Sequence, residues 1–182
     1  MRIIAGTKKG MKLLSPPPLL RFAKPLGLLR KKQRGKQNGG GSRPILDRVK
    51  ESVFSVLYKY DLPAKKIVAD LFCGVGSLGL EALSRGADFV CFVENDQEIV
   101  TLLKKNIAKA GFVKESKVIT ANAFKTGAVL GSKKKAYDLF FIDPPYRLTD
   151  DVGEKSQLSA LFNLLETQAV SMKREIIYYT VV

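Results

Sequence analysis

The sequence predicts an α/β protein with a doubly wound, mainly parallel β-sheet. After Pro63, short apolar runs alternate along the chain with longer segments in which apolar residues recur at helical spacing. The apolar runs are continuous, which is typical of strands buried on both faces, and helices between such strands favour parallel pairing. A length of 182 residues and a hydrophobic content of 46% suit one domain with an ordinary core.

The expected elements follow one another in a simple order. Two short strands at 2–6 and 12–14, joined by a turn at Gly10, open the chain. Asp47 is expected to cap a helix over 47–57, whose buried face carries Val49, Val53, Val56 and Leu57. Strands are then predicted at 67–72, 89–94, 117–121, 137–142 and 175–182, and helices at 78–85, 97–110 and 157–171.

The first quarter of the chain differs in composition from the rest. Residues 1–50 hold 14 of the 31 basic residues and a single acidic residue, so nearly all of the net charge of +14 lies there. Residues 15–42 contain three consecutive prolines, a basic run and three consecutive glycines, a composition typical of a flexible linker. The charge favours a polyanionic partner, either nucleic acid or a membrane surface, with a solvated disordered arm as the alternative. We divide the chain into a short N-terminal β-extension (1–14), a basic insertion (15–42) and one domain (43–182).

Composition also excludes several classes of protein. No run of 18 apolar residues exists, so we expect no membrane span, and the start lacks the apolar segment of a secretory signal, which indicates a cytoplasmic protein. Histidine is absent, which excludes Ser-His-Asp and Cys-His catalysis. With only two cysteines as well, we expect no metal site. Any chemistry must use carboxylates, amides, hydroxyls, backbone groups or a cofactor.

A glycine-rich turn follows the first strand predicted after Pro63. Gly74 and Gly76 allow a tight turn that approaches a ligand, and Gly79 allows close packing of helix on strand. Glu94, at the end of the next strand, can accept hydrogen bonds from both ribose hydroxyls of a nucleoside. The turn therefore indicates a nucleoside cofactor, without deciding between NAD and S-adenosylmethionine.

Two polar residues at the ends of strands allow two interpretations each. Asp70 lies in an apolar run, where a buried acid needs a partner. That partner is either the ammonium group of a bound methionine moiety or the N–H groups of the glycine turn. Asn122, at the end of the third of these strands, either recognises an adenine edge or is a turn residue.

The fourth of these strands ends in Asp143-Pro144-Pro145-Tyr146. The two prolines fix the backbone and remove two N–H donors, so their carbonyl oxygens remain as acceptors in a rigid loop. With the carboxylate of Asp143 and the ring of Tyr146, the loop suits a planar amine whose N–H groups are bound while its ring is stacked. It follows a strand next to the glycine turn, where open α/β sheets bind ligands.

These residues resemble the S-adenosylmethionine-dependent methyltransferases that modify amino groups. More closely, the sequence is similar to the RsmD-type family of small-subunit ribosomal RNA guanine-N2 methyltransferases. The matching stretches are 1–6 with Gly10, 43–44 with 47–51, 70–87 and 143–146. The resemblance covers residues 1–14 and about 42–147.

The resemblance implies a Rossmann-like methyltransferase domain over 43–182 that transfers a methyl group from S-adenosylmethionine to the N2 amine of a guanine in 16S ribosomal RNA. It implies that the cofactor is bound by Asp70, Phe72, Gly74, Gly76, Glu94, Asn95, Asn122 and Ala123. The target amine would be held by Asp143, Pro144, Pro145 and Tyr146. The partner would be ribosomal RNA or the small subunit, contacted by Arg30, Lys31, Lys32, Arg34, Arg43 and Arg48. We expect a monomer.

The chain departs from the family pattern in four respects. Ile45 and Leu46 stand where threonines are usual, Asn122 stands where an aspartate is usual, and the insertion 15–42 exceeds the family's usual connection. The C-terminal strands that normally follow the fifth are missing, so we expect 175–182 to form an uncovered apolar edge. Two alternatives stay open: a DNA adenine-N6 methyltransferase, and a non-catalytic RNA-binding or ribosome-assembly module with a degenerate methyltransferase fold.

Overall fold

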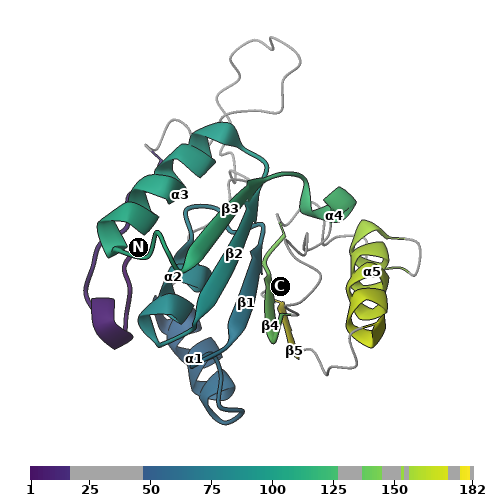
Figure 1. The fold of residues 1–182 in the computed structure, drawn as a ribbon, viewed down its shortest axis with the longest axis horizontal. Helices are drawn as coiled ribbons and strands as arrows, with labels where there is room; N and C mark the ends of the chain where they lie inside the picture. Colours follow the sequence, from purple (N-terminus) through teal and green to yellow (C-terminus); the bar gives the residue numbers. More distant parts are fainter. Residues whose placement is uncertain (17–46, 127–136, 145–152, 154–155, 172–176, 181–182) are drawn as a thin grey trace, which may run out of the picture.

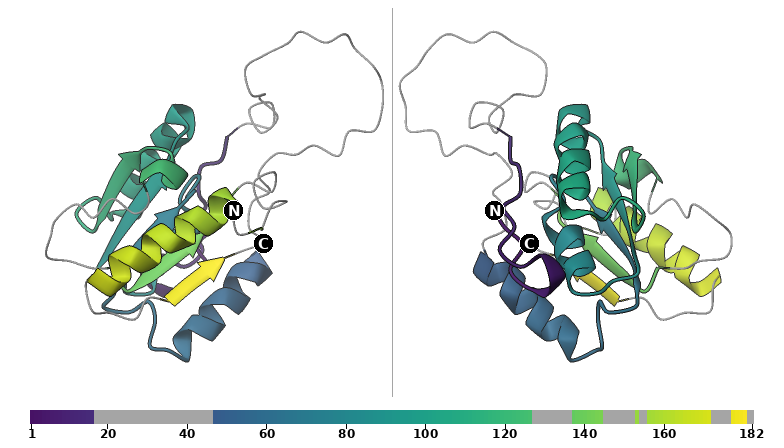
Figure 2. Two further views of the ribbon diagram at one scale, coloured as in Figure 1. Left: turned by 90° about the vertical axis from the view of Figure 1, so that its right-hand side faces the viewer. Right: turned by 60° about the vertical axis from the view of Figure 1, so that its left-hand side comes forward.

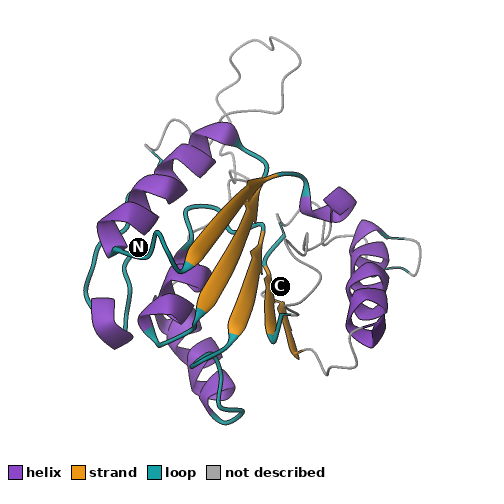
Figure 3. Ribbon diagram, viewed as in Figure 1, coloured by secondary structure: helices purple, strands orange, loops and turns teal. Residues whose placement is uncertain are grey.

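The chain forms a five-stranded parallel β-sheet with helices on both faces (Figure 1 and Figure 3). The computed structural model describes residues 1–16, 47–126, 137–144, 153, 156–171 and 177–180. The strands are β1 (Ile67–Leu71), β2 (Phe89–Glu94), β3 (Ser116–Thr120), β4 (Leu139–Ile142) and β5 (Ile177–Thr180). The helices are η1 (Gly6–Lys8), α1 (Asp47–Tyr58), α2 (Ser77–Ser84), α3 (Gln97–Ala110), α4 (Ala123–Thr126) and α5 (Gln157–Ser171).

The order of the strands confirms the predicted doubly wound sheet. Across the sheet the strands run β3-β2-β1-β4-β5, so the chain moves from β1 toward one edge and then returns to the other side of β1. Leu71 lies opposite both Val93 and Ile142, which brings the carboxyl ends of β1, β2 and β4 to the same level. The order reverses between β1 and β4, and open α/β sheets bind ligands at such a point.

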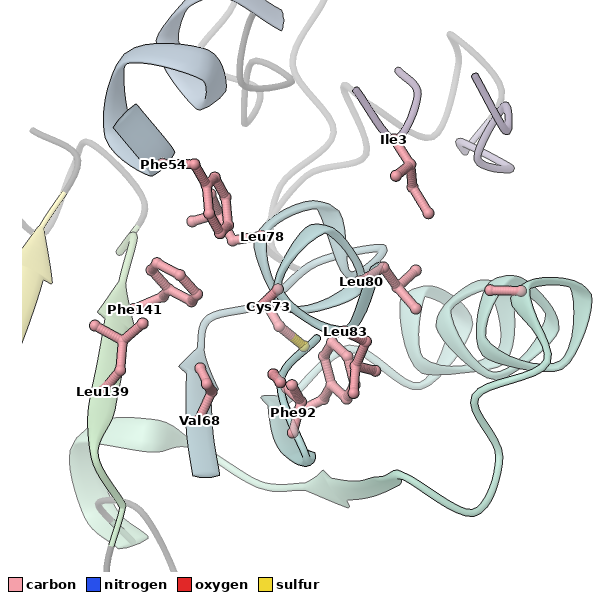
Figure 4. Packing of buried hydrophobic residues seen from close by; sticks show 14 of the residues in the cluster. Ile3, Phe54, Val68, Cys73, Leu78, Leu80, Leu83, Phe92, Leu139 and Phe141 are labelled. Carbon is pink, nitrogen blue, oxygen red and sulfur yellow. The ribbon is translucent and has the colours of Figure 1, made fainter. Parts of the chain in front are cut away.

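Two apolar layers cover the two faces of the sheet, because successive strand residues point to opposite sides. Val68 and its neighbours on one face pack with the N-terminal segment, α1, α2 and α3, as the close view in Figure 4 shows. Ala69 and its neighbours on the other face pack with α4 and α5 (Figure 2). Burial on both faces explains why the strands are continuous apolar runs in the sequence.

Helix α3 shows how local signals set an element's bounds. The carboxylate of Asp96 accepts hydrogen bonds from the N–H groups of Glu98 and Ile99, which caps the first turn. Gly111, with φ of +78°, ends the helix in the left-handed conformation that glycine adopts most easily. Both signals are visible in the sequence, and the predicted bounds 97–110 are confirmed. One face of the helix is buried, through Val100, Leu103, Asn106, Ile107 and Ala110.

The two predicted N-terminal strands pair, but over a shorter stretch than expected: the N–H of Ile3 donates to the carbonyl of Met11 at 3.0 Å, and the N–H of Leu13 donates to the carbonyl of Met1 at 3.1 Å. Arg2 and Lys12 form one isolated antiparallel bridge, and η1 stands where the first strand was expected to end. The N–H groups of Ile4 and Ala5 donate to the carboxylate of Glu81 in α2, at 2.8 and 3.0 Å. Beyond the bridge, the backbone at Ile4 and Ala5 therefore binds α2 and does not continue the pairing.

Glu81 is the centre of a buried ionic cluster. Its side chain is fully buried and lies 3.2 Å from the Nζ of Lys50 and 2.9 Å from the Nε of Arg85. Lys50 also donates a hydrogen bond to the carbonyl of Arg2. Burial lowers the pKa of Lys50, and the charge of Glu81 opposes that shift. Four donors thus share the two oxygens of one carboxylate, which compensates for its removal from water.

The predicted buried face of α1 is half wrong. Val53 and Leu57 are buried as expected, but Val49 and Val56 are 37% and 47% exposed, and Lys50 and Phe54 are buried in their place. The helix is rotated because the ammonium group of Lys50 reaches Glu81. The ring of Phe54 then packs on Phe141 at 5.7 Å and beneath the guanidinium group of Arg85.

The remaining differences concern the ends of elements. Strand β1 ends at Leu71, because Phe72 turns away from the sheet with φ of +59°. The short helix α4 was not expected. Residues 17–46, which contain all but the first two residues of the insertion 15–42 as well as Ile45 and Leu46, lie outside the described residues. In the described part of the chain, none of the helices combines the length and the apolar character that crossing a membrane requires.

The ionic cluster predicts a large loss of stability on substitution of its central residue. Replacing Glu81→Ala leaves Lys50 buried without its partner and two backbone N–H groups unsatisfied, so the free energy of unfolding should fall by about 3–5 kcal/mol. Urea denaturation measures this loss. The control is Glu51→Ala on the exposed side of α1, which should change stability by at most about 0.5 kcal/mol. A loss below about 1 kcal/mol for the Glu81 variant would contradict the central role of the cluster.

Candidate active site

The candidate site lies at the carboxyl edge of the sheet, where three strands end at the same level. The glycine turn follows β1, Glu94 ends β2 and Asp143 follows β4. The register of Leu71 with Val93 and with Ile142 brings these segments side by side, although the sequence separates them by up to about 70 positions. Asn122 and Ala123 follow β3, at the outer end of the same edge.

The glycine turn is tight and is tied to β2. Phe72, Gly74 and Gly76 all have positive φ, of +59°, +54° and +88°. Phe72 has a side chain, so its left-handed conformation costs about 1–2 kcal/mol. Strain of this kind is found mainly at functional sites. The N–H of Gly74 donates to Oε2 of Glu94 at 3.0 Å, which holds the turn against the end of β2.

The three glycines of the turn have different physical roles. A Cβ atom on Gly79 would lie 2.9 Å from Val90 and still closer to the ring of Phe92, so α2 can approach β2 only through a glycine, as predicted. A Cβ on Gly76 would meet Leu103 at 2.6 Å, so this position faces α3. A Cβ on Gly74 would meet nothing within 4 Å. Gly74 is therefore the glycine whose missing side chain leaves open space.

Glu94 organises the loop in addition to ending β2. Its Oε1 accepts hydrogen bonds from the N–H groups of Asn95 and Asp96, at 2.8 and 3.0 Å, and its Oε2 accepts one from Gly74. A carboxylate has about four acceptor positions. Within the described residues, these three donors leave one position on Oε2. Asn95 itself is exposed.

Asp70 is buried and binds the backbone of α2. Its side chain is 1% exposed, and Oδ2 accepts a hydrogen bond from the N–H of Gly79 at 2.8 Å. The residue at the start of α2 is Gly76, which has no side chain, so Asp70 caps the helix from the neighbouring strand. Burial raises the pKa of Asp70 to about 8, and the charges of Asp143 and Glu94 add to the shift. The hydrogen bond from Gly79 agrees with the interpretation in which Asp70 binds backbone N–H groups of the glycine-rich segment.

Asp143 and Pro144 begin the loop that follows β4. Asp143 is partly buried, and its N–H donates to the carbonyl of Leu71, so the loop begins in contact with β1. Burial raises the pKa of its carboxyl group to about 6. Pro144 is buried. Pro145 and Tyr146, the other two residues predicted to hold the amine, lie outside the described residues.

Ala123 is the first residue of α4, and Asn122 directly precedes it. Asn122 is exposed, and its Oδ1 accepts a hydrogen bond from the N–H of Phe124 at 2.9 Å, as in the interpretation of a turn residue. The side chain of Ala123 is buried in the apolar layer with α5. The rings of Phe72 and Phe124 lie 4.8 Å apart and connect the turn after β1 with the turn after β3. The contact of Phe124 was not predicted from the sequence. Its position two residues after Asn122 was the signal that could have placed it near the site.

The basic residues predicted to bind RNA are mostly outside the described residues. Arg48 is exposed in the first turn of α1. Arg30, Lys31, Lys32, Arg34 and Arg43 lie outside the described residues.

Two other polar groups near the turn were not singled out from the sequence. Ser77 is buried, and its Oγ has no hydrogen-bond partner among the described residues. Asn106 in α3 donates to the carbonyl of Val75 in the turn.

Comparison with known proteins decides the family. Residues 26–180 match the model of a family described as conserved hypothetical protein 95. The chain is 32% identical over 180 residues to ribosomal RNA small subunit methyltransferase D of Escherichia coli, which covers 98% of this chain and 73% of that protein. The chain belongs to the RsmD-type methyltransferase family.

Other members of the family and solved structures agree with this assignment. A putative rRNA methyltransferase, YlbH of Bacillus subtilis, is 29% identical over 91% of this chain and 74% of its own length. The structure of a putative methyltransferase of Escherichia coli, yhhF, superimposes with a TM-score of 0.63 at 29% identity, over 91% of this chain and 71% of that one. A hypothetical protein of Thermus thermophilus gives a TM-score of 0.64 at 25% identity, over 92% and 77%. The Rossmann-like methyltransferase fold expected from the sequence is confirmed.

The glycines of this family member predict two different costs of substitution. Gly79→Ala forces a methyl group into Val90 and Phe92, so the free energy of unfolding should fall by about 3 kcal/mol. Gly74→Ala meets open space and adds only the strain of a left-handed alanine, about 1 kcal/mol. Urea denaturation of both variants measures the difference. Equal losses would show that the open space at Gly74 is not a property of the folded protein.

The raised pKa of Asp70 predicts how stability changes with pH. Between the ordinary pKa of about 4 and the folded value of about 8, the folded state holds a proton that the unfolded state has released, so stability falls as pH rises. In Asp70→Asn the amide oxygen can still accept the hydrogen bond from the Gly79 N–H. The amide does not titrate, so the contribution of residue 70 to the slope of unfolding free energy against pH disappears. Unfolding free energies at several pH values between about 5 and 8 measure the slope. The exposed Asp88→Asn is the control and should keep the wild-type slope; equal slopes in all three proteins would contradict the prediction.

Proposed function

We propose that this chain is an S-adenosylmethionine-dependent methyltransferase that modifies the exocyclic N2 amine of a guanine in small-subunit ribosomal RNA. The observation that carries the proposal is the meeting of two loops at one sheet edge. Asp143 and Pro144 follow β4, directly beside the glycine turn of β1. An amine-binding loop next to a cofactor turn is the arrangement that methyl transfer to an amine needs, because both reactants must be held together.

The residues of the turn fit the proposed cofactor. The open space at Gly74 leaves room for a ligand close to the backbone. Oε2 of Glu94 keeps one acceptor position in the described structure, which suits a ribose hydroxyl. The second ribose hydroxyl would have to share Glu94 with one of the backbone donors already bound there. Ser77, with its unpartnered buried hydroxyl, adjoins the same turn.

The charge of the site also fits a cationic cofactor. Asp70, Glu94 and Asp143 are close enough for their charges to raise the pKa of Asp70. A positively charged ligand at this edge would favour the ionised form of Asp70 and offset its repulsion with the carboxylates of Glu94 and Asp143. S-adenosylmethionine supplies, when bound, an electrophilic methyl group on a positively charged sulfur.

Asp143 is the residue best suited to handle the amine. With a pKa of about 6 it is mostly ionised at neutral pH and can accept a hydrogen bond from an amine N–H. A methylated amine nitrogen must lose one proton, and a carboxylate of this pKa is a suitable acceptor for it. Pro144 has no N–H, so its carbonyl oxygen can serve as a second acceptor without a competing donor. In the rest of the loop, we propose that the carbonyl oxygen of Pro145 is a further acceptor and that the ring of Tyr146 stacks on the base.

The proposed substrate rests on the relatives and on the charge of the chain. The relatives named above include two that are called ribosomal RNA methyltransferases. Phosphate contacts from Arg48 and from the basic residues of 30–43 would add affinity that falls with salt. The target guanine must be unpaired or leave its stack to reach the loop after β4. We propose that the protein acts as a monomer in the cytoplasm.

A methyl-transfer assay tests the proposal and separates it from both alternatives. The purified chain is incubated with S-adenosylmethionine carrying a labelled methyl group and with deproteinised 16S ribosomal RNA, small ribosomal subunits or duplex DNA. Label recovered as N2-methylguanosine from either ribosomal substrate is the expected result. Label on DNA adenine would identify a DNA methyltransferase. Binding of RNA without transfer to any substrate would identify a non-catalytic module.

Substitution of Asp143 tests its proposed role in binding the amine. Asp143→Ala should lower kcat by at least about 100-fold, the size of a general-base contribution, while cofactor affinity stays within about twofold. Wild-type kcat should fall as pH is lowered through about 6, because protonated Asp143 no longer accepts the amine hydrogen. The exposed Asp88→Ala, at the opposite end of the sheet, should leave both values unchanged. Full turnover by the Asp143 variant would remove this residue from the mechanism.

A further inference from the structure

A polar side chain interrupts the buried face of α3. Val100, Leu103, Ile107 and Ala110 on this face are apolar, but Asn106 between them is an amide and is fully buried. An amide in such a position costs stability unless its hydrogen bonds are satisfied. Asn106 satisfies them with backbone groups from two distant segments of the chain.

The first segment is the N-terminal one, residues 1–14, which packs along α2 and α3. The N–H of Leu14 donates to Oδ1 of Asn106 at 2.7 Å, and Nδ2 of Asn106 donates to the carbonyl of Leu14 at 3.1 Å. The side chain of Asn106 therefore pairs with the backbone of Leu14 as a neighbouring strand would. The second segment is the glycine turn, where Nδ2 donates to the carbonyl of Val75 at 3.0 Å.

These contacts require an amide in particular. Asn106 provides one acceptor for Leu14 and two donors, for Leu14 and Val75, from one planar group. An aspartate would keep the acceptor and lose both donors. A leucine of similar volume would lose all three bonds and leave the buried carbonyl of Val75 and the two part-buried backbone groups of Leu14 without this partner.

Helix α3 thus supports the glycine turn at two consecutive residues. Leu103, one turn earlier on the same face, packs under Gly76, while Asn106 holds the carbonyl of Val75. Val75 immediately follows Gly74, whose N–H is bound by Glu94. The turn is fixed from the β2 side by Glu94 and from the α3 side by Asn106.

We propose that Asn106 is a positioning residue for the glycine turn and that, through it, the N-terminal segment and the bound cofactor stabilise one another. This inference rests on the proposed binding of S-adenosylmethionine at the turn. The effect on the two partners is reciprocal, because a contact that strengthens cofactor binding is itself strengthened by the cofactor. Two consequences can be measured separately: cofactor affinity and the protection of the Leu14 N–H.

Calorimetric titration with S-adenosylmethionine measures the first consequence. Asn106→Ala should raise the dissociation constant about tenfold, which corresponds to about 1.4 kcal/mol. The matched control is Lys109→Met on the exposed side of the same helix. Lys109 donates to the carbonyl of Lys12 at 2.7 Å, so this variant also loosens the N-terminal segment but does not touch the turn. The dissociation constant of this variant should stay within about twofold of the wild-type value, because the loss of one exposed contact changes the free energy only slightly.

Hydrogen exchange of the Leu14 N–H measures the second consequence. In the wild type and in Lys109→Met, saturating cofactor should slow this exchange. In Asn106→Asp the acceptor for Leu14 remains and the donor to Val75 is lost, so the cofactor should no longer change the exchange rate. If the buried charge prevents this variant from folding, the affinity of Asn106→Ala decides alone, because alanine introduces no charge. Circular dichroism establishes that each variant is folded.

The outcomes separate this inference from the proposed function. Cofactor binding by the wild type, with an unchanged dissociation constant in folded Asn106→Ala, would overturn the role of Asn106 and leave the proposed function intact. Absence of binding by the wild type would overturn both. Equal weakening in Asn106→Ala and Lys109→Met would show that any loosening of the N-terminal segment acts on the site, and would also overturn the specific role of Asn106.

Discussion

The buried carboxylate of Glu81 is the constraint on which the rest of the structure depends. It accepts hydrogen bonds from the N–H groups of Ile4 and Ala5, and pairs with Lys50 of α1 and Arg85 at the end of α2. A charge in the apolar layer is tolerated only with this number of partners. Three elements that are distant in the sequence must therefore meet at one point. Because Glu81 belongs to the helix that begins at the glycine turn, its cluster also sets the position of the candidate site.

The site itself carries costs that the fold has to compensate. Phe72 is held in a left-handed conformation, and the charges of Glu94 and Asp143 at the carboxyl edge of the sheet disfavour ionisation of the buried Asp70. Both features lower stability in the absence of a ligand and suit a cationic one. The supports are backbone hydrogen bonds from opposite sides, from Glu94 at the end of β2 and from Asn106 in α3. Rigid elements therefore fix the position of a turn that would otherwise relax.

The sequence predicted the elements that depend on local pattern. The bounds of α3 and α5 and the order of strands and helices after Pro63 are confirmed, because capping residues, glycines and apolar runs are signals within a few positions. It failed where a side chain has a distant partner. The pairing of the N-terminal strands is shorter than predicted, because the N–H groups of Ile4 and Ala5 bind Glu81. The face of α1 is wrong because Lys50, a residue expected in water, is buried beside that same carboxylate.

The alternation of apolar runs and helical segments was enough to predict the doubly wound sheet. Short motifs at the ends of its strands predicted the glycine turn after β1, the acid at the end of β2 and the loop after β4. The tertiary structure alone decided what each residue does there. It placed Gly76 against α3 and Gly74 beside open space, made Asp70 the cap of α2, and placed Asn106 under the turn. The physical reason is that a local period specifies which residues turn inward, whereas hydrogen-bond partners and free space depend on segments that only folding brings together.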